Sequence, residues 1–149
     1  MGRRLDIGYA SALADFEFEQ ATNDLWSPGE DQQPVRTYAM STQNRRLFCL
    51  MACRASFSCS PTTPSAVAKS LGISRNAVDT MINECEEADW IKVTRDKNLY
   101  RSFVAEKIMV DTYIAYALAF ADASDAADLA GISSARKHAK RLGLYNPNS

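Results

Sequence analysis

The chain has 149 residues, of which 46% are hydrophobic and 23% charged, and its formal net charge is −1. Length and composition fit one ordinary globular domain, residues 1–149, with a core of its own, and no apolar run has membrane-spanning length. The near-neutral charge argues against a protein that coats nucleic acid non-specifically, and the lack of a secretory signal predicts a cytoplasmic location.

Apolar residues at helical spacing predict an amphipathic N-terminal helix over residues 6–23. Its apolar positions are Leu5, Tyr9, Ala12, Leu13 and Phe16. The polar stretch from Asp24 to Thr42 contains Pro28, Gly29 and Pro34, which is typical of a long connection. Because such a length is unusual for a structureless connection, it is expected to hold a short helix or to cross to another subunit.

The next predicted helix, residues 43–57, is apolar around most of its circumference and should be central in the fold. Cys49 and Cys53 are four residues apart and so share one face of this helix. A redox-sensing thiol pair is one interpretation. We favour two buried hydrophobic residues, because no nearby residue in the sequence would lower a thiol pKa. The cysteine spacings and the single His138 do not fit a zinc site, so no metal and no cofactor are expected.

Residues 63–91 have the pattern of a helix-turn-helix. Thr63 suits an N-cap, Pro64 suits the first helical position, and Gly72 can take the left-handed conformation that ends a helix. Ser74 is a second N-cap, and the helix after it has the core positions Val78, Met81, Ile82 and Cys85. The other face of that helix has side chains able to read base edges: Arg75, Asn76, Asp79, Thr80 and Asn83. An ordinary helical hairpin is the alternative.

A β-hairpin is predicted directly after this motif. Ile91–Thr94 alternates like a strand, Arg95–Asn98 is a polar turn, and Leu99–Val104 is the return strand. A hairpin in this position is a wing, and its basic residues are Lys92, Arg95, Lys97 and Arg101. We expect them to contact DNA phosphates or the minor groove. A solvated hairpin tip is the alternative.

The C-terminal third, residues 105–149, begins with a helix from Ala105 to Ala123 that is apolar almost all round. We expect this helix and the N-terminal helix to pair with a second subunit; packing only on its own N-terminal helix is the alternative. Ser124–Ala130 is predicted as a short helix. A basic helix over Ser133–Leu142 follows, with Arg136, Lys137, His138, Lys140 and Arg141. The Gly-Ile-Ser sequence at 131–133 repeats that at 72–74 and leaves a second helix-turn-helix open.

Taken together, the segment Arg45–Val104 resembles a winged-helix transcriptional regulator. The residues that carry the resemblance are Pro64–Ala68, Leu71–Arg75, Val78 and Glu86–Ile91. The outer helices and the total length are similar to those of MarR-type regulators, which are dimeric. The resemblance implies a mainly α fold with a small β-hairpin wing. In this fold a winged helix-turn-helix core, residues 43–104, lies between flanking N- and C-terminal helices. The family usually has Gly where Asp89 stands, although Asp tolerates the left-handed conformation better than most residues.

These features predict a sequence-specific, homodimeric regulator of transcription that binds double-stranded DNA, and not an enzyme. Ser74 and its helix N-terminus would hold a phosphate, while Arg75, Asn76 and Thr80 read bases. A small-molecule effector pocket is expected near Tyr113 and Tyr116. The alternative is a winged-helix module that binds proteins and not DNA. It is motivated by the acidic residues of the second helix, Asp79, Glu84, Glu86 and Glu87.

Overall fold

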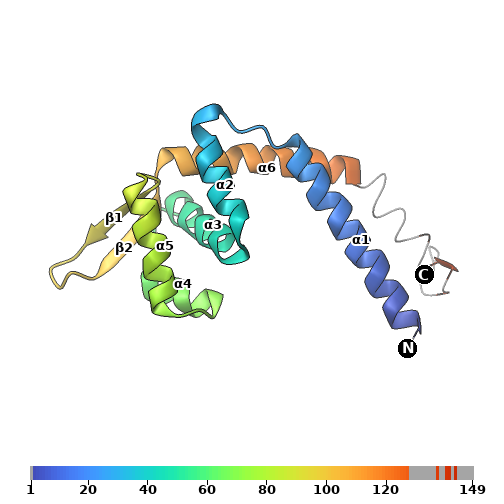
Figure 1. Ribbon diagram of the computed structural model, residues 1–149, viewed down its shortest axis with the longest axis horizontal. Coiled ribbons are helices and arrows are strands. Elements are labelled where there is room, and N and C mark those ends of the chain that lie inside the picture. The colour runs from blue at the N-terminus through green and yellow to red at the C-terminus, as the bar shows by residue number, and fades with distance from the viewer. Residues whose placement is uncertain (1, 128–136, 138–139, 142, 144–149) are drawn as a thin grey trace. The chain divides into compact units, whose positions relative to one another are not determined.

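The structure, a computed structural model, describes residues 2–127, 137, 140–141 and 143 (Figure 1). Its elements in chain order are α1 (Gly2–Leu25), the 3-10 turn η1 (Glu30–Gln32), α2 (Gln33–Ser41), α3 (Gln43–Phe57), α4 (Pro64–Leu71), α5 (Arg75–Glu87), β1 (Ile91–Arg95), β2 (Arg101–Ala105) and α6 (Lys107–Ala127). Among these helices, none is both long enough and apolar enough to cross a membrane.

The chain forms two compact units. The winged unit is Pro28–Ile114, and the terminal unit combines Met1–Ser27 with Ala115–Ser149. The expectation of a single domain over residues 1–149 stays a prediction.

A helix-turn-helix followed by a wing forms the middle of the winged unit and confirms the predicted fold class. Strands β1 and β2 pair antiparallel, with Ile91 opposite Ala105 and Arg95 opposite Arg101. Thr62, just before α4, extends this sheet by one position. Its N–H donates to the Phe103 carbonyl at 3.1 Å, and the Phe103 N–H donates back at 2.9 Å. The wing is therefore fixed to the start of the helix-turn-helix as well as to its end.

Both helices of the helix-turn-helix begin as the sequence predicts, and the first also ends at the predicted residue. The Thr63 hydroxyl accepts from the Ala66 N–H at 3.2 Å, and the Ser74 hydroxyl accepts from the Ala77 N–H at 3.1 Å. Gly72 ends α4 with φ 65°, in the left-handed conformation. Asp89 takes the same conformation after α5, with φ 59°.

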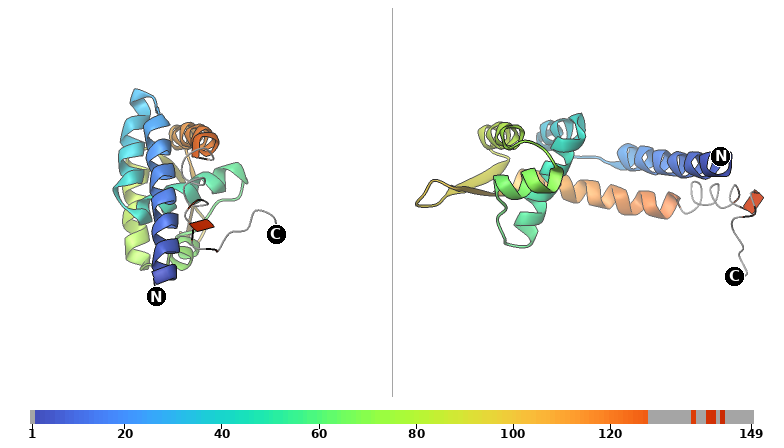
Figure 2. Two further views of the ribbon diagram at one scale, coloured as in Figure 1. Left: turned by 90° about the vertical axis from the view of Figure 1, so that its right-hand side faces the viewer. Right: turned by 90° about the horizontal axis from the view of Figure 1, so that it is seen from below.

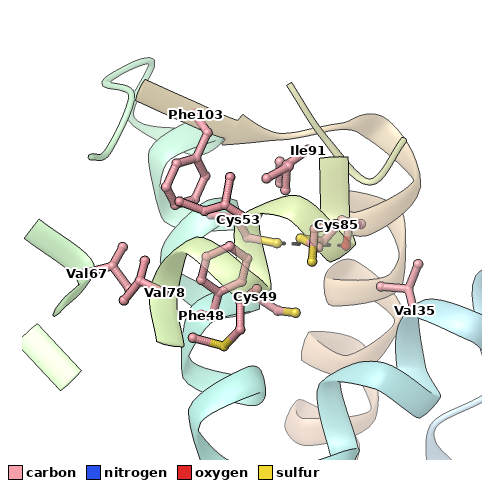
Figure 3. Packing of buried hydrophobic residues seen from close by; sticks show 14 residues of the cluster. Val35, Phe48, Cys49, Cys53, Val67, Val78, Cys85, Ile91 and Phe103 are labelled. Carbon is pink, nitrogen blue, oxygen red and sulfur yellow. Dashed lines mark hydrogen bonds between the residues drawn. The ribbon is translucent and has the colours of Figure 1, made fainter. Parts of the chain in front are cut away.

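The core of the winged unit gathers apolar side chains from its helices and from the wing (Figure 3). Phe48 of α3 stacks on Phe103 of β2 with ring centroids 5.3 Å apart, and neither ring is exposed to solvent by more than 1%. The predicted core face of α5 is confirmed, because Val78, Met81, Ile82 and Cys85 are all buried. Burial of each large side chain contributes about 1.5–3 kcal/mol, so this core fixes the orientation of α5.

Three sequence predictions need correction. The stretch 24–42 is mostly ordered as η1 and α2 and not as a long connection, because Val35 anchors α2 in the core at 1% exposure. The short helix alternative is thus the right one. The return strand begins at Arg101, two residues later than predicted. The helix predicted to start at Ser124 is, as far as Ala127, a continuation of α6. The basic segment Ser133–Leu142 lies mostly outside the described residues.

In the terminal unit, α1 packs on the second half of α6. The rings of Phe18 and Phe120 meet edge to face at 4.8 Å, and those of Trp26 and Tyr116 do so at 5.1 Å. Packing on the N-terminal helix of the same chain therefore occurs. Several large apolar side chains of this unit are nevertheless exposed: Tyr9, Leu13, Phe16, Leu25, Leu118 and Phe120. Pairing with a second subunit stays a prediction that this exposed face supports.

Candidate nucleic-acid interface

The solvent face of α5 holds the residues that the sequence selects as base readers. Arg75, Asn76, Thr80 and Asn83 are exposed, whereas Asp79 is partly covered. Ser74 precedes them as the N-cap, so the free backbone N–H groups of the first turn lie at the same end. Because the opposite face of α5 is buried in the core, the helix can present only this face to a partner.

Arg75 is held over the start of α4. Its Nη1 donates to the Ser65 hydroxyl at 2.8 Å, and its Nε lies 3.4 Å from Asp79 Oδ1. Ser65 thus adjoins the candidate site, and its only signal in the sequence is a serine in the first turn of the first helix. The Thr80 hydroxyl donates to the Asn76 carbonyl at 3.0 Å, and Thr80 remains exposed.

Arg101 of β2 joins the wing to α5. Its guanidinium forms an ion pair with Asp79 through Nη2, and its Nη1 donates to Asn83 Oδ1 at 3.2 Å. Only 18% of the Arg101 side chain is exposed. The structure thus brings together three predicted site residues, but it gives Arg101 a bridging position and not an open one.

The other basic residues of the wing divide into two kinds. Arg95 reaches back to α5 and pairs with both carboxylate oxygens of Glu86, at 3.3 and 3.4 Å. Lys92 and Lys97 are exposed, and neither has an ion-pair partner within the part of the chain that the structure describes. These two lysines are the wing cations open to an incoming phosphate.

Glu84 of α5 is also engaged inside the unit. It accepts from the Tyr38 hydroxyl at 2.7 Å and pairs with Arg45 at 3.4 Å. The rings of Tyr38 and Trp90 meet edge to face, with centroids 5.4 Å apart. The Arg45 guanidinium lies over the Tyr38 ring, 4.7 Å from its centroid. Burial, and secondarily the bond to Glu84, raises the pKa of Tyr38 well above its usual range, so the phenol stays a donor.

Cys49 and Cys53 are both buried, as the interpretation of two buried hydrophobic residues predicts. Cys49, Cys53 and Cys85 are buried free thiols, and Cys59 is exposed. Burial raises the pKa of Cys53 to about 12 and that of Cys85 to about 11. It also raises the pKa of Cys49. Raised values disfavour the reactive thiolate, which argues against a redox sensor. His138 lies outside the described residues.

A cavity of about 380 Å3 opens between α3, the end of α4 and the start of α6 within the winged unit. It is lined by Leu47, Leu50, Met51, Arg54, Phe57, Leu71 and Tyr113. Tyr113 is one of the lining residues, and its ring lies 5.8 Å from that of Phe57. Tyr116 does not line it and packs on Trp26 in the terminal unit.

The solved structures that match this chain include a transcription regulator and a repressor. MepR, a transcription regulator of the Staphylococcus aureus multidrug efflux pump MepA, has 12% sequence identity and a TM-score of 0.48, over 78% of this chain and 76% of that one. The adhesin competence repressor AdcR from Streptococcus pyogenes has 14% identity and a TM-score of 0.44, over 81% and 78%. No family model and no curated protein matches the sequence.

Both comparisons cover more than three quarters of this chain and of the solved chain. The winged-helix fold itself follows from the caps, the buried face of α5 and the paired strands of the wing.

Proposed function

We propose that the protein is a homodimeric, sequence-specific DNA-binding regulator of transcription. One observation carries this proposal: three of the four acidic residues of α5 are paired within the chain. Asp79 pairs with Arg75 and Arg101, Glu84 with Arg45, and Glu86 with Arg95. Their negative charge is therefore compensated locally, and the first two turns of α5 can approach a polyanion.

The roles of the side chains follow from their chemistry. Ser74 and the first-turn N–H groups suit a phosphate, because a helix N-terminus has a positive partial charge. Arg75 suits guanine O6 and N7, and Asn76 suits adenine N6 and N7, in the major groove. Lys92 and Lys97 of the wing suit the DNA backbone, which positions the helix without reading sequence.

Dimerisation is proposed through the terminal unit. Phe16 and Leu118 are 62% and 64% exposed in the single chain, and further apolar side chains of α1 and α6 are exposed with them. An apolar surface of this kind marks an interaction site. Two-fold symmetry would place two copies of α5 in successive major grooves, about 10–10.5 base pairs apart.

A small-molecule effector is part of the proposal. The cavity beside α3 has a volume within the range of ligand pockets, about 300–1,000 Å3, and an apolar lining with one cation, Arg54. This lining suits an apolar molecule with an anionic group. Because Leu71 lines it from α4, a bound molecule would press on the helix-turn-helix.

The experiment is a titration of the purified protein against a library of random 30-base-pair duplexes at several salt concentrations, with sequencing of the bound fraction. Strong salt dependence together with an enriched palindrome supports the proposal. The absence of binding at low salt would overturn it. That outcome would favour the alternative of a winged helix that docks on proteins, for which Glu87 is the remaining open acid of α5.

A further inference from the structure

The wing tip, residues Asp96–Tyr100, is a closed and ordered loop. The Asp96 N–H donates to the Tyr100 carbonyl, and the Leu99 N–H donates to the Asp96 carbonyl, both at 3.0 Å. Asp96 Oδ1 accepts from the Asn98 N–H at 2.8 Å and from the Tyr100 N–H at 3.0 Å. The Asp96 side chain thus holds the loop in one conformation, and the wing tip has a defined shape before any partner arrives.

This loop displays large apolar side chains to solvent. Leu99 is 76% exposed and Tyr100 is 70% exposed. Leu99 also has φ 62°, a left-handed conformation that is a genuine outlier for a bulky residue. Neither the backbone preference of leucine nor the hydrophobic effect favours it in this place, where glycine or asparagine would serve folding better. Strain of this kind is held by the surrounding structure and gathers at functional sites.

The surroundings of the tip indicate what it meets. The hairpin projects away from the helices of the winged unit (Figures 1 and 2). Lys97 stands in the tip itself, and Arg101 ties the same hairpin to α5. The exposed apolar side chains of the tip suit a partner with an apolar interior that a side chain can enter. The exposed Lys97 suits a partner with a negatively charged surface. Duplex DNA has both, in its phosphates and its stacked bases.

We propose that Leu99 acts as an apolar wedge that enters the minor groove and partly unstacks one base step in each half-site. Leucine is among the side chains that proteins insert in this way, and such insertion kinks the duplex toward the major groove. Pyrimidine–purine steps unstack most easily, so the wedge would add sequence preference beside the bases that α5 contacts. The inference rests on the proposed DNA-binding function and adds DNA deformation to it.

The test uses the full-length protein and a duplex selected from the random library, with 2-aminopurine placed in turn at each step that flanks the α5 half-site. The fluorescence of this base rises when it unstacks. For the wild-type protein we expect a rise at one step per half-site. For Leu99→Gly we expect no rise and affinity weaker by roughly fivefold or more. Glycine suits the left-handed conformation, so this variant keeps the loop while removing the side chain.

Lys97→Ala is the matched control from the same loop. It should reduce the salt dependence of binding by roughly one phosphate contact and keep the 2-aminopurine signal. If the wild-type protein binds the duplex without a signal, or if Leu99→Gly binds and unstacks as the wild type does, the wedge is overturned and the DNA-binding function stands. If the wild type binds no duplex at low salt, both proposals are overturned.

Discussion

Arg101 of the wing and Asp79 of α5 form an ion pair that fastens the hairpin to the helix beside it. Each residue has a second partner, because Arg101 also donates to Asn83 and Asp79 also pairs with Arg75. The reading face of α5 and the wing are therefore one connected polar network. The position of the wing depends on a residue that also lies among the predicted base readers.

Replacing Asp79 tests this network. In Asp79→Ala the guanidinium of Arg101, only 18% exposed, loses its anionic partner. We expect the free energy of unfolding to fall by about 1–3 kcal/mol, because a largely covered charged donor is left with fewer acceptors. Glu87→Ala removes the same charge from an exposed position of α5 and should change stability by less than about 0.5 kcal/mol. Urea unfolding measures both. Equal stability of the two variants would contradict the bridging role.

The buried thiols predict how stability depends on pH. The pKa of Cys85 is raised to about 11 and that of Cys53 to about 12 in the folded chain, whereas an unfolded thiol titrates near about 8.5. Above that value the unfolded chain loses protons that the folded chain retains, so folding stability falls. We expect the urea midpoint of unfolding to be constant between about pH 7 and 8. It should then fall between about pH 8 and 10, because thiols of the unfolded chain lose their protons over this range.

The control for that series is Cys53→Ala, measured with a reductant present at every pH. Removing one buried thiol should make the decline between pH 8 and 10 shallower. A midpoint that rises with pH over this range would show that the thiols are not held protonated by the fold.

Gly72 and Asp89 occupy the same backbone conformation after α4 and α5 and predict opposite mutational effects. A Cβ at Gly72 meets no atom within 4 Å, so the cost of Gly72→Ala is the left-handed backbone alone, about 1 kcal/mol. Asp89→Gly removes that strain and should stabilise by about 0.5 kcal/mol after the entropy of glycine in the unfolded chain is subtracted. Thermal unfolding compares them. A stabilising Gly72→Ala would refute this interpretation of the turn.

The exposed apolar face of the terminal unit predicts a dimer that one charge can disrupt. Leu118→Glu places a carboxylate on a side chain that is 64% exposed in the single chain, so the fold of each copy should persist. At a dimer interface the same carboxylate is buried without a partner, which is unfavourable by several kcal/mol. Met40 of α2 is an exposed apolar side chain of the winged unit and provides the control. We expect sedimentation to show a dimer for the wild type and for Met40→Glu, and a monomer for Leu118→Glu. A wild-type monomer would exclude the proposed assembly.

Local features of this fold could be predicted from the sequence, whereas its polar pairings could not. The helix caps at Thr63 and Ser74 depend only on residues within one turn. The buried residues of α5 recur at helical spacing. Both features can therefore be recognised from the order of residues along the chain. The bond from Tyr38 to Glu84 joins positions 46 residues apart. Without it, the glutamates of α5 look like open negative charge, which is why the sequence leaves a protein-binding module as an alternative.

The wing tip shows the same limit in a smaller loop. An alternating pattern assigns Leu99 and Tyr100 to the return strand, since both residue types suit strands. In the structure, the Asp96 side chain accepts hydrogen bonds from the backbone N–H groups of Asn98 and Tyr100. These bonds hold the residues in a turn. Hydrophobic periodicity does not reveal a side chain that bonds to backbone N–H groups, so the pattern in the sequence extends the strand too far.

The most direct measurement of the central claim, that α5 reads DNA, is parallel selection from random duplexes with the wild type, Arg75→Ala and Lys107→Ala. Lys107 is an exposed basic residue at the start of α6, outside α5, the wing and the cavity beside α3. We expect the wild type and Lys107→Ala to enrich the same palindrome. Arg75→Ala should lose preference at one guanine in each half-site, at a cost of about 1–3 kcal/mol. An unchanged motif and affinity for Arg75→Ala would contradict the assignment of α5 as the reading helix.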